Sequence, residues 1–192
     1  MCIACFVFPK LAAAFPTPQW PADLLLAGCA FATRGCERER FFLMDIQFPC
    51  GREDIERVLP HRDPFAWMTR VVECTPGESI TAELDVDPDL PLFRGHFPTH
   101  PVLPGVIIME ALAQAASFCA LVDRADEGVL GFFAGIDKAK FRNQVLPGDV
   151  LTLSARIVKS SSRMVVADVE ARVGDKVCAT ATQKYVLARS EE

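Results

Sequence analysis

Residues 105–122 read GVIIMEALAQAASFCALV, and this stretch decides the fold. Ala, Leu and Met dominate it and no Gly or Pro follows Gly105, so it predicts an α-helix. The helix is apolar nearly all round and must be surrounded by protein or by lipid. It is short for a membrane span and contains Glu110, Gln114 and Ser117. We therefore expect a helix buried at the centre of a domain.

Around this helix, most segments alternate apolar and polar residues with the period of two that β-strands require. In residues 79–87, for example, Ile80, Ala82, Leu84 and Val86 share one face. Strands are expected at 65–74, 79–87, 129–133, 136–145, 151–157, 165–173 and 176–187, and a short helix at 52–59. The short turns between them favour antiparallel neighbours. The predicted fold class is α+β, with an antiparallel sheet of about six strands wrapped around one long buried helix.

The amino-terminal segment, residues 1–43, has a different character. It carries four prolines, two apolar patches and the charged run 37–40, without clear periodicity or helix caps. We expect a poorly ordered extension, and a mis-assigned start ahead of a true one at Met44 would explain it. A cleaved targeting segment is the alternative, although Asp23 and Pro21 interrupt the apolar region that such a segment needs. Residues 44–192 form the predicted domain.

Charge and cysteine content exclude several classes of protein. The net charge is −5, without a cluster of Lys and Arg, so no nucleic-acid partner is expected. Five of the eight cysteines lie in the first 50 residues, and the others stand among apolar residues as small hydrophobes. We expect reduced thiols and a cytoplasmic protein. We expect no metal, because the spacing of Cys2, Cys5, Cys29 and Cys36 matches no common zinc site.

The segment that leads into the helix, residues 94–106, reads RGHFPTHPVLPGV and carries the first candidate groups for catalysis. Its three prolines stiffen the backbone by fixing φ. The helix start leaves backbone N–H groups at Gly105 and Val106 without helical partners, and an oxyanion can bind there. His96 lies in this rigid loop, where a neutral imidazole can accept a proton.

Three polar side chains of the helix share one face, because Glu110, Gln114 and Ser117 are spaced i, i+4 and i+7. A carboxyl group in apolar surroundings can hold a proton and donate it, so Glu110 is the candidate acid and His96 the candidate base. Gln114 is expected to position Glu110. Structural interpretations remain open: Glu110 as half of a buried salt bridge, and His96 as a hydrogen-bonded loop residue. We interpret His61 and His100 as structural.

The sequence resembles the 3-hydroxyacyl-acyl-carrier-protein dehydratases of the FabZ type from about Arg52 to Ala188. An ordered set of motifs carries the resemblance: Leu59-Pro60-His61-Arg62, Pro64-Phe65, Gly95-His96-Phe97-Pro98, His100-Pro101-Val102, Pro104-Gly105-Val106, Glu110-Ala111, Ala113-Gln114-Ala115, residues 134–142 and Pro147-Gly148-Asp149. Glu110 stands where the related FabA-type isomerases carry Asp, which favours the FabZ type. The sequence departs from the family pattern at Thr69, at Asn143-Gln144 and at Trp67, which leaves chain-length preference and carrier docking open.

This resemblance implies a hot-dog fold and a homodimer or a trimer of dimers, with His96 of one subunit and Glu110 of the other in each active site. It implies the dehydration of (3R)-3-hydroxyacyl chains on the phosphopantetheine of acyl carrier protein. The product would be a trans-2-enoyl chain in type II fatty acid biosynthesis. No cofactor is expected, and no membrane association.

Further expectations concern the substrate and its carrier. The acyl chain is expected in an apolar tunnel beside the central helix, near Phe97, with Phe132 or Phe133 as its gate. A basic patch is expected to meet the acidic carrier protein or else to form a solvated strand face; it comprises Lys138, Lys140 and Arg142. Two alternative functions are a hot-dog acyl-thioester hydrolase and a non-catalytic acyl-binding module.

Overall fold

The computed structural model describes residues 46–189, apart from the side chains of Asp126 and Glu127. The expectations for residues 1–43, for a start at Met44 and for the four cysteines up to Cys36 lie outside the described residues.

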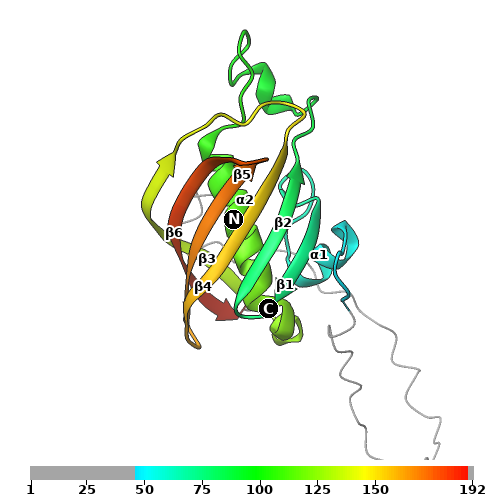
Figure 1. Ribbon diagram of the computed structural model, residues 1–192. Coiled ribbons are helices and arrows are strands. Elements are labelled where there is room, and N and C mark those ends of the chain that lie inside the picture. The colour runs from blue at the N-terminus through cyan, green and yellow to red at the C-terminus, as the bar shows by residue number, and fades with distance from the viewer. Residues whose placement is uncertain (1–45, 190–192) are drawn as a thin grey trace, which may run out of the picture. The chain divides into compact units, whose positions relative to one another are not determined.

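A single antiparallel sheet curls around one long helix (Figure 1). The strands lie in the order β1-β2-β4-β5-β6-β3, each antiparallel to its neighbours. The elements along the chain are α1 (Arg52–Val58), β1 (Arg70–Thr75), β2 (Ser79–Asp85), η2 (Pro91–Arg94), α2 (Gly105–Leu121), η3 (Val122–Glu127), β3 (Val129–Phe141), β4 (Val150–Ser160), β5 (Met164–Val173) and β6 (Lys176–Arg189). The predicted α+β architecture is confirmed.

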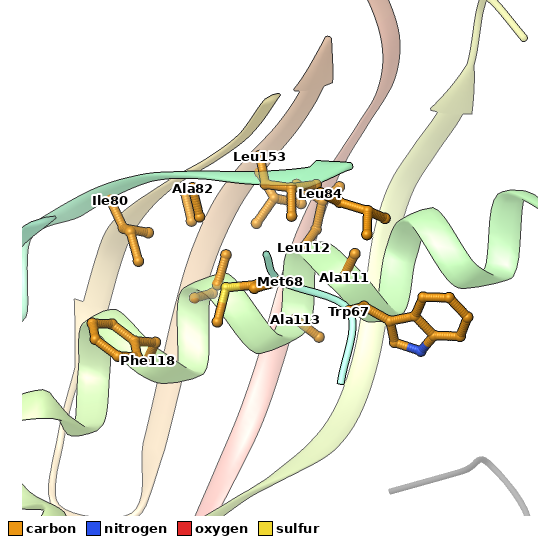
Figure 2. Packing of buried hydrophobic residues seen from close by; sticks show 14 of the residues in the cluster. Trp67, Met68, Ile80, Ala82, Leu84, Ala111, Leu112, Ala113, Phe118 and Leu153 are labelled. Atoms are coloured by element: carbon orange, nitrogen blue, oxygen red, sulfur yellow. The ribbon is translucent and has the colours of Figure 1, made fainter. Parts of the chain in front are cut away.

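The helix α2 is buried because its apolar surface contacts the inner face of the sheet. Leu112 and Phe118 have no exposed surface. Figure 2 shows the side chains of Ile80, Ala82 and Leu84 pointing from β2 toward this helix. The alternation expected for residues 79–87 is therefore confirmed, with the apolar members packed in the core.

The segment Gly105–Ala125 is long and apolar enough to cross a membrane by composition alone, with a mean hydropathy of 1.8. However, 72% of its most apolar window is buried within the protein. The sheet, rather than lipid, covers this helix.

The first strand begins later than the sequence pattern indicates. A strand was expected over 65–74, whereas β1 starts at Arg70. The reason is a competing side chain, since Gln114 accepts a hydrogen bond from the Trp67 N–H (2.8 Å) and donates one to the Phe65 carbonyl (2.9 Å). These backbone groups are bound by α2 instead of by a neighbouring strand.

The two segments expected at 129–133 and 136–145 form one strand, β3, with irregularities between Phe133 and Gly135 and between Asp137 and Lys140. The strand ends at Phe141, four residues earlier than expected. Just beyond it the Arg142 N–H still donates to the Cys178 carbonyl of β6 (2.8 Å), whereas the Val145 carbonyl accepts a hydrogen bond from the Leu103 N–H (2.8 Å), in the loop before α2. The bulges, invisible to a strict period of two, explain why one strand resembled two.

Because the core depends on the contact between α2 and the sheet, we expect Leu112→Ala to lower the free energy of unfolding by about 2–5 kcal/mol. Urea denaturation monitored by circular dichroism measures the change. The control is Val158→Ala, since Val158 is 57% exposed on β4 and its truncation leaves no cavity. Equal stability of the two variants would contradict this account of the core.

Candidate active site

Glu110 lies in the second turn of α2 and is held by Gln114, one turn further along. The Gln114 amide donates a hydrogen bond to Glu110 Oε1 (3.1 Å). The other two hydrogen bonds of Gln114, to Trp67 and Phe65, fix its amide orientation. The supporting role expected of Gln114 from its i, i+4 spacing thus has a geometric basis.

His61 lies beside the same carboxyl group, with Nε2 at 3.7 Å from Glu110 Oε1. Burial lowers the pKa of His61 from its usual 6.5 to about 4, and the charge of Arg62 acts in the same direction. The ring is therefore neutral at pH 7. The contact is a polar contact with a neutral imidazole and not an ion pair.

A narrow cavity of about 20 Å³ runs beside Glu110 between α2 and the strands β3 and β6. Its lining combines polar and aromatic side chains, namely His61, Glu110, Ala113, Gln114, Ser117, Gly131, Phe133 and Tyr185. The strand β3 approaches α2 closely at this cavity, since a Cβ on Gly131 would lie 3.3 Å from Ser117 Oγ. The polar face predicted from residues 110, 114 and 117 is the face that lines this cavity.

His96 lies in the loop between η2 and α2, which projects beyond one end of the sheet (Figure 1). Its Nδ1 is 2.8 Å from the Val102 carbonyl, and the Val102 N–H donates to the His96 carbonyl (3.0 Å). A carbonyl oxygen only accepts hydrogen bonds, so the neutral ring carries its proton on Nδ1. Nε2 then holds the lone pair, as a general base requires.

The N–H groups of Gly105 and Val106 stand at the start of α2, where the first helical donors are Ile107 and Ile108. The ring of Phe141 covers this start, since a Cβ on Gly105 would lie 2.8 Å from Phe141 Cε1. A side chain at position 105 would therefore have to displace the Phe141 ring, which is the end of a side chain that is 55% exposed. The helix start remains a candidate oxyanion site because Val106 is 66% exposed.

The structure unites some of the predicted site residues and separates others. Glu110, Gln114 and Phe133 share the cavity, whereas His96, Phe97 and Phe132 are not among its lining residues. The ring of Phe97 stacks on that of His96, with centroids 4.2 Å apart. Within one protomer, the candidate base His96 therefore does not line the cavity of the candidate acid Glu110.

On the sheet face opposite α2 lies an open groove of about 660 Å³. Its floor includes a cross-strand row of register partners: Thr81, Ser154, Glu170, Thr180 and Lys140. Lys138, Lys140 and Arg142 line the groove together, and Arg142 donates a hydrogen bond to Thr180 Oγ1 (2.9 Å). The three basic residues predicted as a patch thus line one groove, whose lining also includes Asp168 and Glu170.

Sequence reasoning missed two residues of the cavity. His61 was interpreted as structural, yet it contacts Glu110, and Tyr185 was not considered. A signal for Tyr185 exists in the alternation of β6, where Gln183 and Tyr185 occupy the inward register of Ala181 and Leu187. Two polar side chains in an otherwise apolar register indicate a specific partner in the core.

An antiparallel sheet wrapped around a buried central helix is the architecture of the hot-dog fold. A solved structure, the dehydratase heterocomplex ApeI:P from Xenorhabdus doucetiae, shares the fold, with a TM-score of 0.59 at 18% identity over 76% of this chain and 94% of that one. A family model described as the FabA-like domain matches residues 59–182.

Curated relatives are more similar in sequence. The 3-hydroxyacyl-[acyl-carrier-protein] dehydratase FabZ of Ruminiclostridium cellulolyticum is 45% identical over 138 residues, or 72% of this chain and 97% of the relative. The protein of the same name from Streptococcus equi subsp. zooepidemicus is 40% identical over 147 residues, or 77% of this chain and 100% of the relative. The chain belongs to the FabA-like family, as a dehydratase of the FabZ type.

The low pKa of His61 predicts a pH-dependent stability. Between pH 6.5 and about 4 the unfolded state binds more protons at this ring than the folded state does. The contribution is therefore complete above pH 6.5, declines as the pH falls, and is lost below about 4. The loss is on the order of 2 kcal/mol once solvent screening of this partly buried ring is allowed for. Urea unfolding of the wild type and of His61→Gln at pH 7, 6 and 5 measures it. Parallel pH profiles of the two proteins would refute the prediction.

Proposed function

We propose that this chain converts a (3R)-3-hydroxyacyl chain on acyl carrier protein to the trans-2-enoyl chain in fatty acid biosynthesis, with His96 as base and Glu110 as acid. The observation that carries this proposal is that hydrogen bonds fix the tautomer of His96 and the orientation of the Glu110 carboxyl group. Val102 holds the Nδ1 proton of His96, and Gln114 orients the Glu110 carboxyl beside a narrow cavity.

The reaction is a β-elimination of water. His96 Nε2 takes the proton from the carbon next to the thioester carbonyl, and the electron pair forms the new double bond. The C3–O bond breaks as Glu110 delivers a proton to the leaving hydroxyl. The N–H groups of Gly105 and Val106 stabilise the negative charge that develops on the thioester oxygen. The enoyl product and the released water together have the same oxidation level as the substrate, so the reaction requires no redox cofactor.

We propose that two protomers share each active site. The strand β3 is an edge of the sheet, pairs with β6 along one side and presents Ile136 and Phe141 at 40% and 55% exposure. A long edge strand with apolar side chains favours pairing with a second copy about a two-fold axis. Such a pairing offers a way for His96 of one protomer to meet Glu110 of the other. The dimer itself, or a trimer of such dimers, is the proposed assembly.

We propose that Phe133 borders the acyl chain, because it lines the cavity with Glu110. Acyl carrier protein is proposed to dock on the basic patch of Lys138, Lys140 and Arg142. Phe141 stands between Lys140 and Arg142 in the sequence, and its ring lies against the start of α2, where the oxyanion site is proposed. We also propose that the enzyme works in the cytoplasm, where buried thiols such as Cys119 and Cys178 stay reduced.

For the catalytic pair, we expect His96→Ala and Glu110→Gln each to lower kcat by roughly a hundredfold or more, since each removes a proton-transfer group. The assay follows enoyl product and free thiol from a carrier-bound 3-hydroxyacyl thioester. Enoyl formation supports a dehydratase, whereas release of free thiol would indicate a hydrolase. Binding of the thioester without turnover would indicate a non-catalytic acyl-binding module. Wild-type turnover by either folded variant would disprove its assigned role.

The same two variants test whether the site is shared. After unfolding and refolding as an equal mixture, half of the dimers are mixed, and each mixed dimer contains one site with both His96 and Glu110. Activity should therefore return to roughly one quarter of the wild-type value. If the two residues acted within one protomer, the mixture would remain inactive.

For carrier docking, we expect the triple change Lys138→Glu, Lys140→Glu and Arg142→Glu to raise KM for a carrier-bound substrate by roughly tenfold or more, because like charges then repel the acidic partner. The KM for the same acyl chain on a short pantetheine thioester should not change. The matched control is Lys159→Glu, at the exposed far end of β4. An equal rise in KM for both substrates would contradict docking at this patch.

A further inference from the structure

Two polar side chains of β6 point into the core at the place where this strand passes α2. Gln183 has no exposed surface and Tyr185 is 2% exposed. Their neighbours on the same face of the strand, Ala179, Ala181 and Leu187, are apolar. Burying a polar side chain is unfavourable unless it is hydrogen-bonded, so this pair requires an explanation beyond packing.

The pair forms a short chain of hydrogen bonds that ends on the backbone of α2. The Tyr185 hydroxyl donates to Gln183 Oε1, and the Gln183 amide donates to the Met109 carbonyl at 2.9 Å. The Met109 carbonyl only accepts hydrogen bonds, so the NH2 end of the Gln183 amide faces the helix and its Oε1 is left to accept from the Tyr185 hydroxyl. Met109 immediately precedes Glu110.

Tyr185 also reaches the cavity beside Glu110. Its ring lines this cavity and makes an edge-to-face contact with Phe133, with centroids 5.5 Å apart. Burial, and then the charge of Glu110, raise the pKa of Tyr185 well above its usual value. The phenol therefore remains protonated and keeps donating to Gln183 across the working pH range.

The two buried glutamines of the described part of the chain converge on one residue. Gln114 is 2% exposed and Gln183 has no exposed surface. Gln114 bonds the Glu110 carboxyl, and Gln183 bonds the peptide carbonyl just before Glu110. One sets the side chain of the candidate acid and the other sets its backbone.

We propose that Gln183 and Tyr185 are positioning residues, which tie the backbone of α2 at Met109 to β6 and thereby fix the proton donor Glu110. This inference rests on the proposed role of Glu110 as the acid. The hydrogen bonds contribute to turnover through geometry, because a small displacement of a proton donor reduces its rate of transfer.

The test separates this role from a contribution to stability alone. Tyr185→Phe leaves Gln183 Oε1 buried without its donor, and Gln183→Met leaves the Tyr185 hydroxyl without its acceptor. Each single variant should lower the Tm by roughly 2 to 10 °C. The double variant removes both polar groups and should recover most of this loss, because replacing both partners with apolar groups is nearly neutral.

Turnover should not recover in the double variant. We expect its kcat for a 3-hydroxyacyl thioester to stay roughly ten- to a hundredfold below the wild type, with KM within about twofold. All kinetics are measured well below the lowest Tm of the set. The control is Lys184→Met, because Lys184 points away from the core and pairs with Asp137, and it should keep wild-type kcat.

A double variant with kcat within about twofold of the wild type would overturn the proposal, and so would a loss in which KM changes with kcat. The parallel measurement on Glu110→Gln keeps this failure distinct from failure of the proposed function. If Glu110→Gln is inactive and the double variant is fully active, the role of Glu110 as the acid is supported and the positioning role of Gln183 and Tyr185 is wrong. If Glu110→Gln is fully active, the proposed chemistry itself is wrong.

Discussion

The structure depends on enclosing a helix that is apolar on nearly every side. Because α2 has little polar surface to present to water, the sheet must curl until its inner face covers the helix. Burying a polar group in this core costs free energy, and the buried glutamines Gln114 and Gln183 both lie next to Glu110. Burial of the helix therefore stabilises the fold and also places the Glu110 carboxyl group among fixed polar neighbours, Gln114 and His61.

Much of this arrangement could be predicted from local patterns. The composition of 105–122 predicted the helix, the alternation of 79–87 predicted the buried face of β2, and the i, i+4 spacing predicted the Gln114–Glu110 contact. The start of β1 could not be predicted, because a side chain from α2 binds the backbone where a strand partner would. The cavity residues His61 and Tyr185 come from segments distant in sequence, which periodicity cannot bring together.

The separation of the two proposed catalytic residues within one protomer has a physical origin. His96 is carried by a loop that is stiffened by prolines and held by its own hydrogen bonds with Val102, so it cannot easily fold back toward Glu110. Glu110 is equally fixed within α2. If the two act as the proposed catalytic pair, two-fold symmetry is the simplest way to bring them together, because it requires no movement of either within its protomer. The free edge of β3 offers the surface for such a union.

The contact between Phe141 and Gly105 has a consequence for substitutions at position 105. Gly105, whose amide opens α2, is also the residue on which the Phe141 ring rests, so that a larger residue there would have to push the ring aside. A substitution at position 105 would therefore disturb two things at once, the seat of the Phe141 ring and the backbone N–H that we propose as an oxyanion donor.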